Sequence, residues 1–170
     1  MGKDCVVEWE AVAYSRGVKT ILAPVDFSDV SEAVVAEASR LAKALGGRVV
    51  LLTVIQPPVI TNEYAPLMEN IAEITAAGEK AASKRLASIQ ERLEAQSLSV
   101  EVVQLNGAPV TQIADQAAKL RADYVVMGSH GHTAFYDLLV GSTTHGVLMR
   151  ATCPVVIVPA QTTKKASQAR

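Results

Sequence analysis

Glycine and hydroxyl residues recur at fixed spacing in the second half of the chain. Gly128-x2-Gly131 is followed, after nine further residues, by Gly141 and Ser142. Glycine lets a backbone approach a ligand closely, and the first N–H groups of a helix attract anions. The pattern therefore predicts a phosphate-binding site, although its spacing is neither that of Walker A nor that of the dinucleotide fingerprint.

The segments on either side of this glycine loop are expected to hold it in place. An apolar run from Tyr124 to Met127 is typical of a strand buried on both faces, and a helix is expected over residues 142–150. Asp26 follows a similar apolar run over residues 18–25. Ligands of open parallel sheets bind beyond the carboxyl ends of strands where the strand order reverses. If these two strands are neighbours at that point, Asp26 faces the glycine loop.

Strand-like and helix-like segments alternate along the chain. Strands are expected over residues 18–25, 48–55, 99–105, 124–127 and 154–158, with helices between them. Alternation of this kind predicts an α/β, Rossmann-like fold. A single open parallel sheet with five strands then carries helices on both faces.

Two of the expected helices carry local signals. Asp29 followed by Glu32 resembles a capping box at the start of the first helix, and Gly46 with Gly47 ends it. A longer helix runs to about Gln96. Its expected inner face, which meets solvent near Lys84 and Arg85, consists of Ile71, Ile74, Gly78, Ala81, Arg85, Ile89 and Leu93.

Composition favours one packed domain. Of the 170 residues, 49% are hydrophobic and 19% charged, which suits an ordinary buried core. We assign residues 1–17 to an N-terminal extension, 18–159 to the domain, and 160–170 to a polar tail expected to be disordered.

Charge and cysteine content exclude several classes of protein. A formal net charge of -1 gives no reason to expect nucleic acid or an anionic membrane as partner. Two cysteines are too few for a disulfide scaffold, and no apolar run approaches the length of a membrane span. We expect a soluble protein of the cytoplasm.

With these segments the chain resembles the universal stress protein family, specifically its ATP-binding branch, over about residues 18–159. The glycine spacing matches the nucleotide motif of that family. Three further segments are similar to it: Ile21–Ser28, Leu51–Val54 and Cys153–Val158. The resemblance implies a strand order of 3-2-1-4-5 with a nucleotide across the switch point.

The resemblance also implies a set of binding residues. The carboxylate of Asp26 would lie near the ribose or a Mg²⁺ or Mn²⁺ ion held by the phosphates, and the backbone of Val54 would meet the adenine edge. The glycine loop and the helix start after it would hold ribose and phosphates. Thr53 stands where many members have His. The expected nucleotide-binding residues are Pro24, Val25, Asp26, Val54, Met127, Gly128, Ser129, His130, Gly131, His132, Gly141, Ser142, Thr143 and Thr144.

Plainer interpretations stay open for several of these residues. The glycines can serve turns alone, and Asp26 can simply cap the first helix. The pair His130 and His132 invites a metal hypothesis but lacks further ligands in the sequence.

For function, we expect an ATP-dependent regulatory switch with little or no hydrolysis, acting on an unknown regulated protein. Binding of cyclic AMP or another adenine nucleotide, slow ATPase activity and nucleotidyl transfer are the alternatives. No lysine lies between Lys119 and Lys164, and no arginine between Arg121 and Arg150, which disfavours fast phosphoryl transfer. We also expect a homodimer that pairs through the apolar strand near residues 155–158.

Overall fold

The computed structural model describes residues 17–56, 68–129 and 140–160, without the side chains of 68–72 and 74. The elements along the chain are β1 (Thr20–Pro24), α1 (Ser31–Leu45), β2 (Arg48–Ile55), α2 (Met68–Glu94), β3 (Ser99–Asn106), α3 (Pro109–Lys119), β4 (Tyr124–Gly128), α4 (Ser142–Leu148) and β5 (Val155–Val158). Each expected strand is present, with ends shifted by two residues at most. None of the described helices combines the length and hydrophobicity that a membrane crossing requires.

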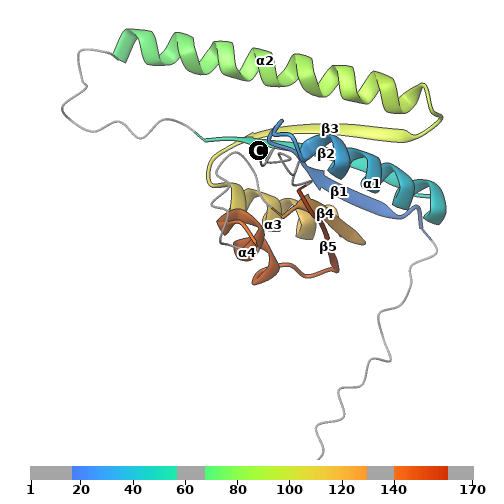
Figure 1. Cartoon of the computed structure of the whole chain (residues 1–170). Coiled ribbons are helices and arrows are strands. Elements are labelled where there is room, and N and C mark those ends of the chain that lie inside the picture. The colour runs from blue at the N-terminus through green and yellow to red at the C-terminus, as the bar shows by residue number, and fades with distance from the viewer. Residues whose placement is uncertain (1–16, 57–67, 130–139, 161–170) are drawn as a thin grey trace, which may run out of the picture.

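The five strands form one sheet in the order β3-β2-β1-β4-β5, and all neighbouring pairs are parallel (Figure 1). This confirms the predicted topology. Strand β1 lies between β2 and β4, with Ile21 opposite Val49 on one side and Tyr124 on the other. The chain order reverses between β1 and β4, so the predicted switch point lies at the carboxyl ends of these two strands.

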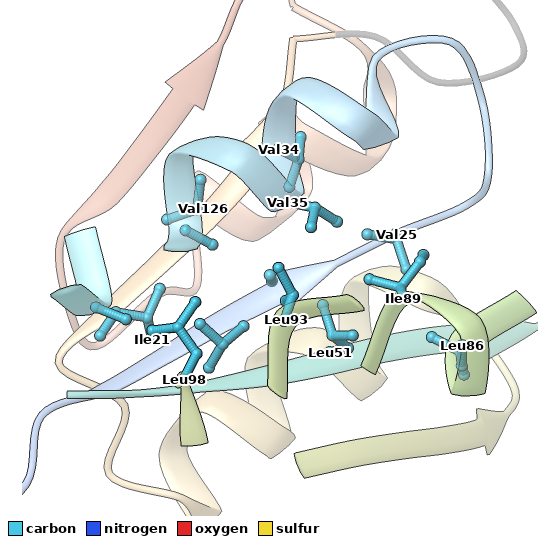
Figure 2. Close-up of a cluster of buried hydrophobic side chains, with 14 of the residues drawn as sticks. Ile21, Val25, Val34, Val35, Leu51, Leu86, Ile89, Leu93, Leu98 and Val126 are labelled. Atoms are coloured by element: carbon cyan, nitrogen blue, oxygen red, sulfur yellow. The ribbon is translucent and has the colours of Figure 1, made fainter. Parts of the chain in front are cut away.

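Alternating side chains divide the core between the two faces of the sheet. Ile21 and Leu51 point to the face covered by α1 and α2, where they pack among Val34, Leu86 and other apolar residues (Figure 2). The opposite face belongs to α3 and α4. Its buried residues are Leu22, Val50, Leu52, Ile113, Ala117, Ala122, Val125, Met127 and Val147.

The start of α1 differs from the predicted capping box. The N-cap residue is Val30, and no side chain caps the helix there. The carboxylate of Asp26 instead accepts a hydrogen bond from the hydroxyl of Ser31, the first residue of the helix. At the other end the prediction is confirmed, because Gly46 adopts a left-handed conformation with φ of 61° and donates its N–H to the carbonyl of Ala42.

The inner face of α2 is confirmed in part. Ile89 and Leu93 are buried as expected, but Ala81 and Arg85 are exposed, and Ala82 and Leu86 are buried instead. The side chains of Ile71 and Ile74 lie outside the described part of the structure. Alanines occur all around this helix, so they give little information on its orientation. Large apolar side chains have more surface to remove from water, and they therefore decide which face turns inward.

Candidate functional site

A cavity of about 460 Å³ lies at the carboxyl edge of the sheet, at the switch point between β1 and β4. Its walls come from the ends of β1, β2 and β4 and from the starts of α1, α3 and α4. Ten of the predicted binding residues line it: Pro24, Val25, Asp26, Val54, Met127, Gly128, Gly141, Ser142, Thr143 and Thr144. The fold therefore brings together residues more than 100 positions apart in the sequence.

The other four predicted residues are placed differently. Ser129 does not line the cavity and is only 7% exposed. Its backbone and hydroxyl are hydrogen-bonded to other segments of the chain. His130, Gly131 and His132 lie outside the described residues.

Asp26 contributes the one charged side chain among the described residues that line the cavity. It is exposed, and its Oδ1 atom accepts hydrogen bonds from the N–H and hydroxyl of Ser28 and, at 3.0 Å, from the hydroxyl of Ser31. The residue thus orders the turn into α1 and also presents a carboxylate to the cavity. Both interpretations made from the sequence are compatible with this position.

A single carboxylate beside the cavity suits a Mg²⁺ ion held chiefly by a ligand's phosphates, because Mg²⁺ takes one or two carboxylates together with phosphate and water. Within the described ranges, no three His, Cys, Asp or Glu side chains gather into a metal site. The donor set therefore fits an ion that arrives with a phosphate ligand.

The hydroxyl groups at the start of α4 have two different roles. Thr144 is only 4% exposed, and its hydroxyl donates a 2.8 Å hydrogen bond to the carbonyl of Gly128. This bond ties α4 to the end of β4. Ser142 is exposed and Thr143 half-buried, and both line the cavity. The first N–H groups of the helix have no acceptor within it, so they are suited to bind an anion.

The β2 side of the cavity is held by two hydrogen bonds between neighbouring strand ends. The N–H of Val25 donates to the carbonyl of Leu52 at 2.8 Å, and the hydroxyl of Thr53 donates to the carbonyl of Val25 at 2.9 Å. Thr53 is 4% exposed, so this bond forms away from bulk water. Val54, the next residue, is half-buried and lines the cavity.

Phe27 is a lining residue that the sequence did not single out. It is one of three non-glycine residues with positive φ in the described part of the chain, at 61°. The guanidinium carbon of Arg85 lies 5.4 Å from the centre of its ring, within the range of a cation–π contact. This contact joins α2 to the cavity wall, and no local sequence pattern predicts it.

The lining residues outside the predicted binding set come from strand ends, from helix starts and, for Ala82, from the middle of α2. They are Val30, Ser31, Val34, Leu52, Thr53, Ile55, Gln56, Ala82, Pro109 and Ile113. The signal for Ile55 and Gln56 was available, since residues at the carboxyl end of β2 share the ligand edge with those at the ends of β1 and β4.

Comparison with known proteins agrees with this architecture. The profile of the universal stress protein family matches residues 17–159. A universal stress protein of Thermus aquaticus is 31% identical over 145 residues, which cover 82% of this chain and 98% of the relative. The chain therefore belongs to the universal stress protein family.

Solved structures of that family have the same fold. The structure of MJ0577 from Methanocaldococcus jannaschii superposes with a TM-score of 0.72 at 28% identity, covering 84% of this chain and 96% of the other. A universal stress protein solved in complex with cAMP gives a TM-score of 0.59 at 25% identity, covering 85% of this chain and 98% of the other.

Proposed function

We propose that this protein binds an adenine nucleotide, with ATP as its ligand, in the cavity at the carboxyl edge of the sheet. The observation that carries the proposal is the convergence of Asp26, Gly128 and the start of α4 on one cavity at the switch point. A family member in complex with cAMP supports an adenine nucleotide as the class of ligand.

Each wall of the cavity is assigned to a part of the nucleotide. The N–H groups and the hydroxyls of Ser142 and Thr143 bind phosphate oxygens, while apolar lining residues such as Val25 and Val54 enclose the base. Asp26 meets the ribose or a Mg²⁺ ion carried by the phosphates. We expect an affinity in the micromolar range, about 8 kcal/mol of binding free energy.

Cyclic AMP is the second candidate ligand, and the complex of a family member with it is the observation in its favour. Calorimetry with ATP and with cAMP distinguishes the two. Mass spectrometry of ligand released from the purified protein identifies what the cavity takes up in the cell.

We further propose that ATP acts as a switch ligand and is hydrolysed slowly or not at all. Fast phosphoryl transfer requires neutralisation of charge at the γ-phosphate and a positioned water. Asp26 is the only charged residue among the described cavity-lining residues, and the sequence from 122 to 149 has neither lysine nor arginine. We expect turnover far below the roughly 10 s⁻¹ of a median enzyme.

A cavity-filling substitution tests the site itself. Thr143→Trp places a large ring among the lining residues and should lower ATP affinity at least about tenfold, ~1.4 kcal/mol. Thr111→Trp adds the same ring at an exposed position of α3 outside the cavity and serves as the control. Equal ATP affinity in both variants would place the nucleotide elsewhere.

The sheet edge formed by β5 is proposed as the contact between two copies of the chain. Among the described strands β5 pairs with β4 alone, and all four of its residues are half-buried Val or Ile. An apolar edge strand of this kind invites antiparallel pairing with a second copy across a two-fold axis.

The two edges of the sheet provide matched variants for the dimer. Val156→Lys in β5 should yield monomers of 18.0 kDa by light scattering. Val100→Lys introduces the same charge into β3 at the opposite edge, and both valines pack against the same core cluster. Dimers that survive Val156→Lys would contradict pairing through β5.

A further inference from the structure

Ser129 lies where three segments of the chain meet. Its N–H donates to the carbonyl of Val158, the last residue of β5, at 2.8 Å. Its own carbonyl accepts the N–H of Gly141, directly before α4, at 2.7 Å. Its Oγ accepts the N–H of Ala160, two residues beyond β5, at 3.1 Å. One buried residue therefore joins the end of β4, the end of β5 and the start of α4.

The residues that Ser129 joins belong to two different regions. Gly128, its chain neighbour, and Gly141, its hydrogen-bond partner, both line the cavity. Val158 and Ala160 belong to the strand at the sheet edge and to its exit. A ligand that fixes the backbone at Gly128 and Gly141 restrains Ser129 from two sides.

We propose that Ser129 is a positioning residue that transmits occupancy of the cavity to the carboxyl end of β5. This inference rests on the proposed nucleotide binding. When the cavity is occupied, the restrained hydroxyl of Ser129 holds the N–H of Ala160 more firmly. When it is empty, this end of β5 opens more often. Coupling is reciprocal, so a partner that fixes the end of β5 strengthens ligand binding by the same factor.

The side chains of β5 contact the core on both faces of the sheet. Val156 and Val158 pack against one core cluster, and Val155 and Ile157 against the other. A shift at the end of this short strand therefore reaches both faces of the sheet. In contrast, the hydroxyl of Thr144 donates to the carbonyl of Gly128, and both residues line the cavity. This hydrogen bond therefore does not reach β5.

Amide hydrogen exchange measured by NMR tests the transmission. In the wild-type protein, saturating ATP should slow exchange of the Ala160 amide by about tenfold, a coupling of ordinary size. In Ser129→Ala the backbone bonds remain but the acceptor Oγ is lost, and the slowing should fall below about twofold. Each variant is measured at a concentration of ATP that saturates it, so occupancy is equal. Ser129→Thr, which keeps the oxygen, should restore the slowing.

Ser39→Ala is the matched control. Ser39 is another buried serine, with its hydroxyl bonded to the carbonyl of Val35 inside α1. This variant should keep the full ATP effect on the Ala160 amide. A mere loss of stability would affect both alanine variants alike, whereas a positioning role affects Ser129→Ala alone.

The outcomes separate this inference from the proposed function. If calorimetry shows that ATP binds to the wild-type protein while the Ala160 amide exchanges at an unchanged rate, the transmission is wrong and the nucleotide site stands. The transmission is equally wrong if Ser129→Ala retains the wild-type slowing. If ATP does not bind at all, both proposals are overturned.

Discussion

The two ends of the parallel sheet differ in how they use charged side chains. At the amino end they bind one another: Lys19 donates to Oδ1 of Asp123 at 2.8 Å, and the N–H of Thr20 donates to Oδ2 at 2.8 Å. Arg48 pairs with Glu101 at 2.9 Å in the same region. At the carboxyl end, Asp26 is the single charged residue among those described around the cavity, and small residues leave space open.

The difference follows from the direction of the strands. In a parallel sheet all carboxyl ends meet at one edge, where loops are free to diverge and enclose a ligand. The amino ends meet at the opposite edge, where the ion pairs Lys19–Asp123 and Arg48–Glu101 link neighbouring segments. Cys153 lies at this amino end, two residues before β5. Burial first, and then the charge of Asp123, raise the pKa of its thiol. A protonated thiol is a poor nucleophile.

The comparison predicts that changes at the amino end alter stability but not ligand affinity. The largest effect is expected for Gly47→Ala. A Cβ atom there would come within 2.5 Å of the backbone oxygen of Lys19, and backbone cannot move aside cheaply. Overpacking of this kind costs about 3 kcal/mol. Chemical denaturation should show the loss, while ATP affinity of the folded protein stays within about twofold.

Gly78→Ala is the control for this substitution. Apart from the glycine itself, its chain neighbours and the local helix backbone, no described heavy atom lies within 4 Å of the Cβ position of Gly78 in helix α2. The added methyl should therefore stabilise the helix by up to about 1 kcal/mol. Equal effects of the two substitutions would contradict the close approach at Gly47.

Asp123→Asn should have the second largest effect. Burial alone would raise the pKa of Asp123, but hydrogen bonds from Lys19 and the Thr20 N–H, with the charge of Lys19, lower it overall. Hydrogen bonds to a charged group contribute about 2 kcal/mol at neutral pH.

The stability lost in Asp123→Asn should depend on pH. The folded-state pKa of Asp123 lies below the unfolded value of about 3.9, so the stabilisation is present above that pH. It is lost as the pH falls through the folded-state pKa. Denaturation curves of the variant and the wild type should converge in acid. A constant gap from pH 7 down to pH 2 would show that Asp123 acts by shape rather than charge.

Ser142→Ala tests the carboxyl end of the sheet, where a substitution should change ligand affinity but not stability. Ser142 is exposed beside the cavity, so loss of its hydroxyl should leave the free energy of unfolding unchanged. ATP affinity should fall by roughly 1–2 kcal/mol, as for one hydrogen bond to a charged group. Ser83→Ala, which removes an exposed hydroxyl of α2 that is bonded to Gln104, should leave the affinity intact. Calorimetry on both variants decides.

Together with the resemblance to the universal stress protein family, the sequence was sufficient for the order of the strands and for much of the cavity wall. The carboxyl ends of parallel strands share one edge, so Asp26 and Gly128 lie together once their strands are neighbours. That strands β1 and β4 are neighbours was implied by the family resemblance and not by the apolar runs themselves. The sequence could not show which side chains form hydrogen bonds with one another or with the backbone. Whether Thr144 turns to a ligand or to the carbonyl of Gly128 depends on how α4 lies against β4.

The same limit explains Ser129 and Phe27. In the chain Ser129 is one more polar residue of a glycine loop, and only the approach of β5 shows it buried among three segments. Phe27 owes its position to a left-handed backbone and to Arg85, which is distant in sequence. Contacts between distant segments carry no local pattern, so they become visible only in the folded chain.

The smallest expected effect concerns Asp26, the one charged side chain among the described residues that line the cavity. Asp26→Asn keeps a side-chain oxygen that can accept from Ser28 and Ser31, so the turn into α1 should persist and the protein should remain as stable as before. What the variant loses is the negative charge beside the cavity. Mg²⁺ should then strengthen ATP binding less than in the wild type, by about 1 kcal/mol or roughly fivefold.

Asp29→Asn is the matched control, because Asp29 is an exposed acid three residues away that does not line the cavity. It should retain the full Mg²⁺ effect in calorimetry with and without the ion. The affinity for ATP alone should rise slightly in Asp26→Asn, since a carboxylate without metal repels phosphate. These two changes have opposite signs, and no loss of structure produces both. If the Mg²⁺ effect survives intact in Asp26→Asn, Asp26 serves the turn into α1 alone, and the carboxyl end binds its ligand without using that charge.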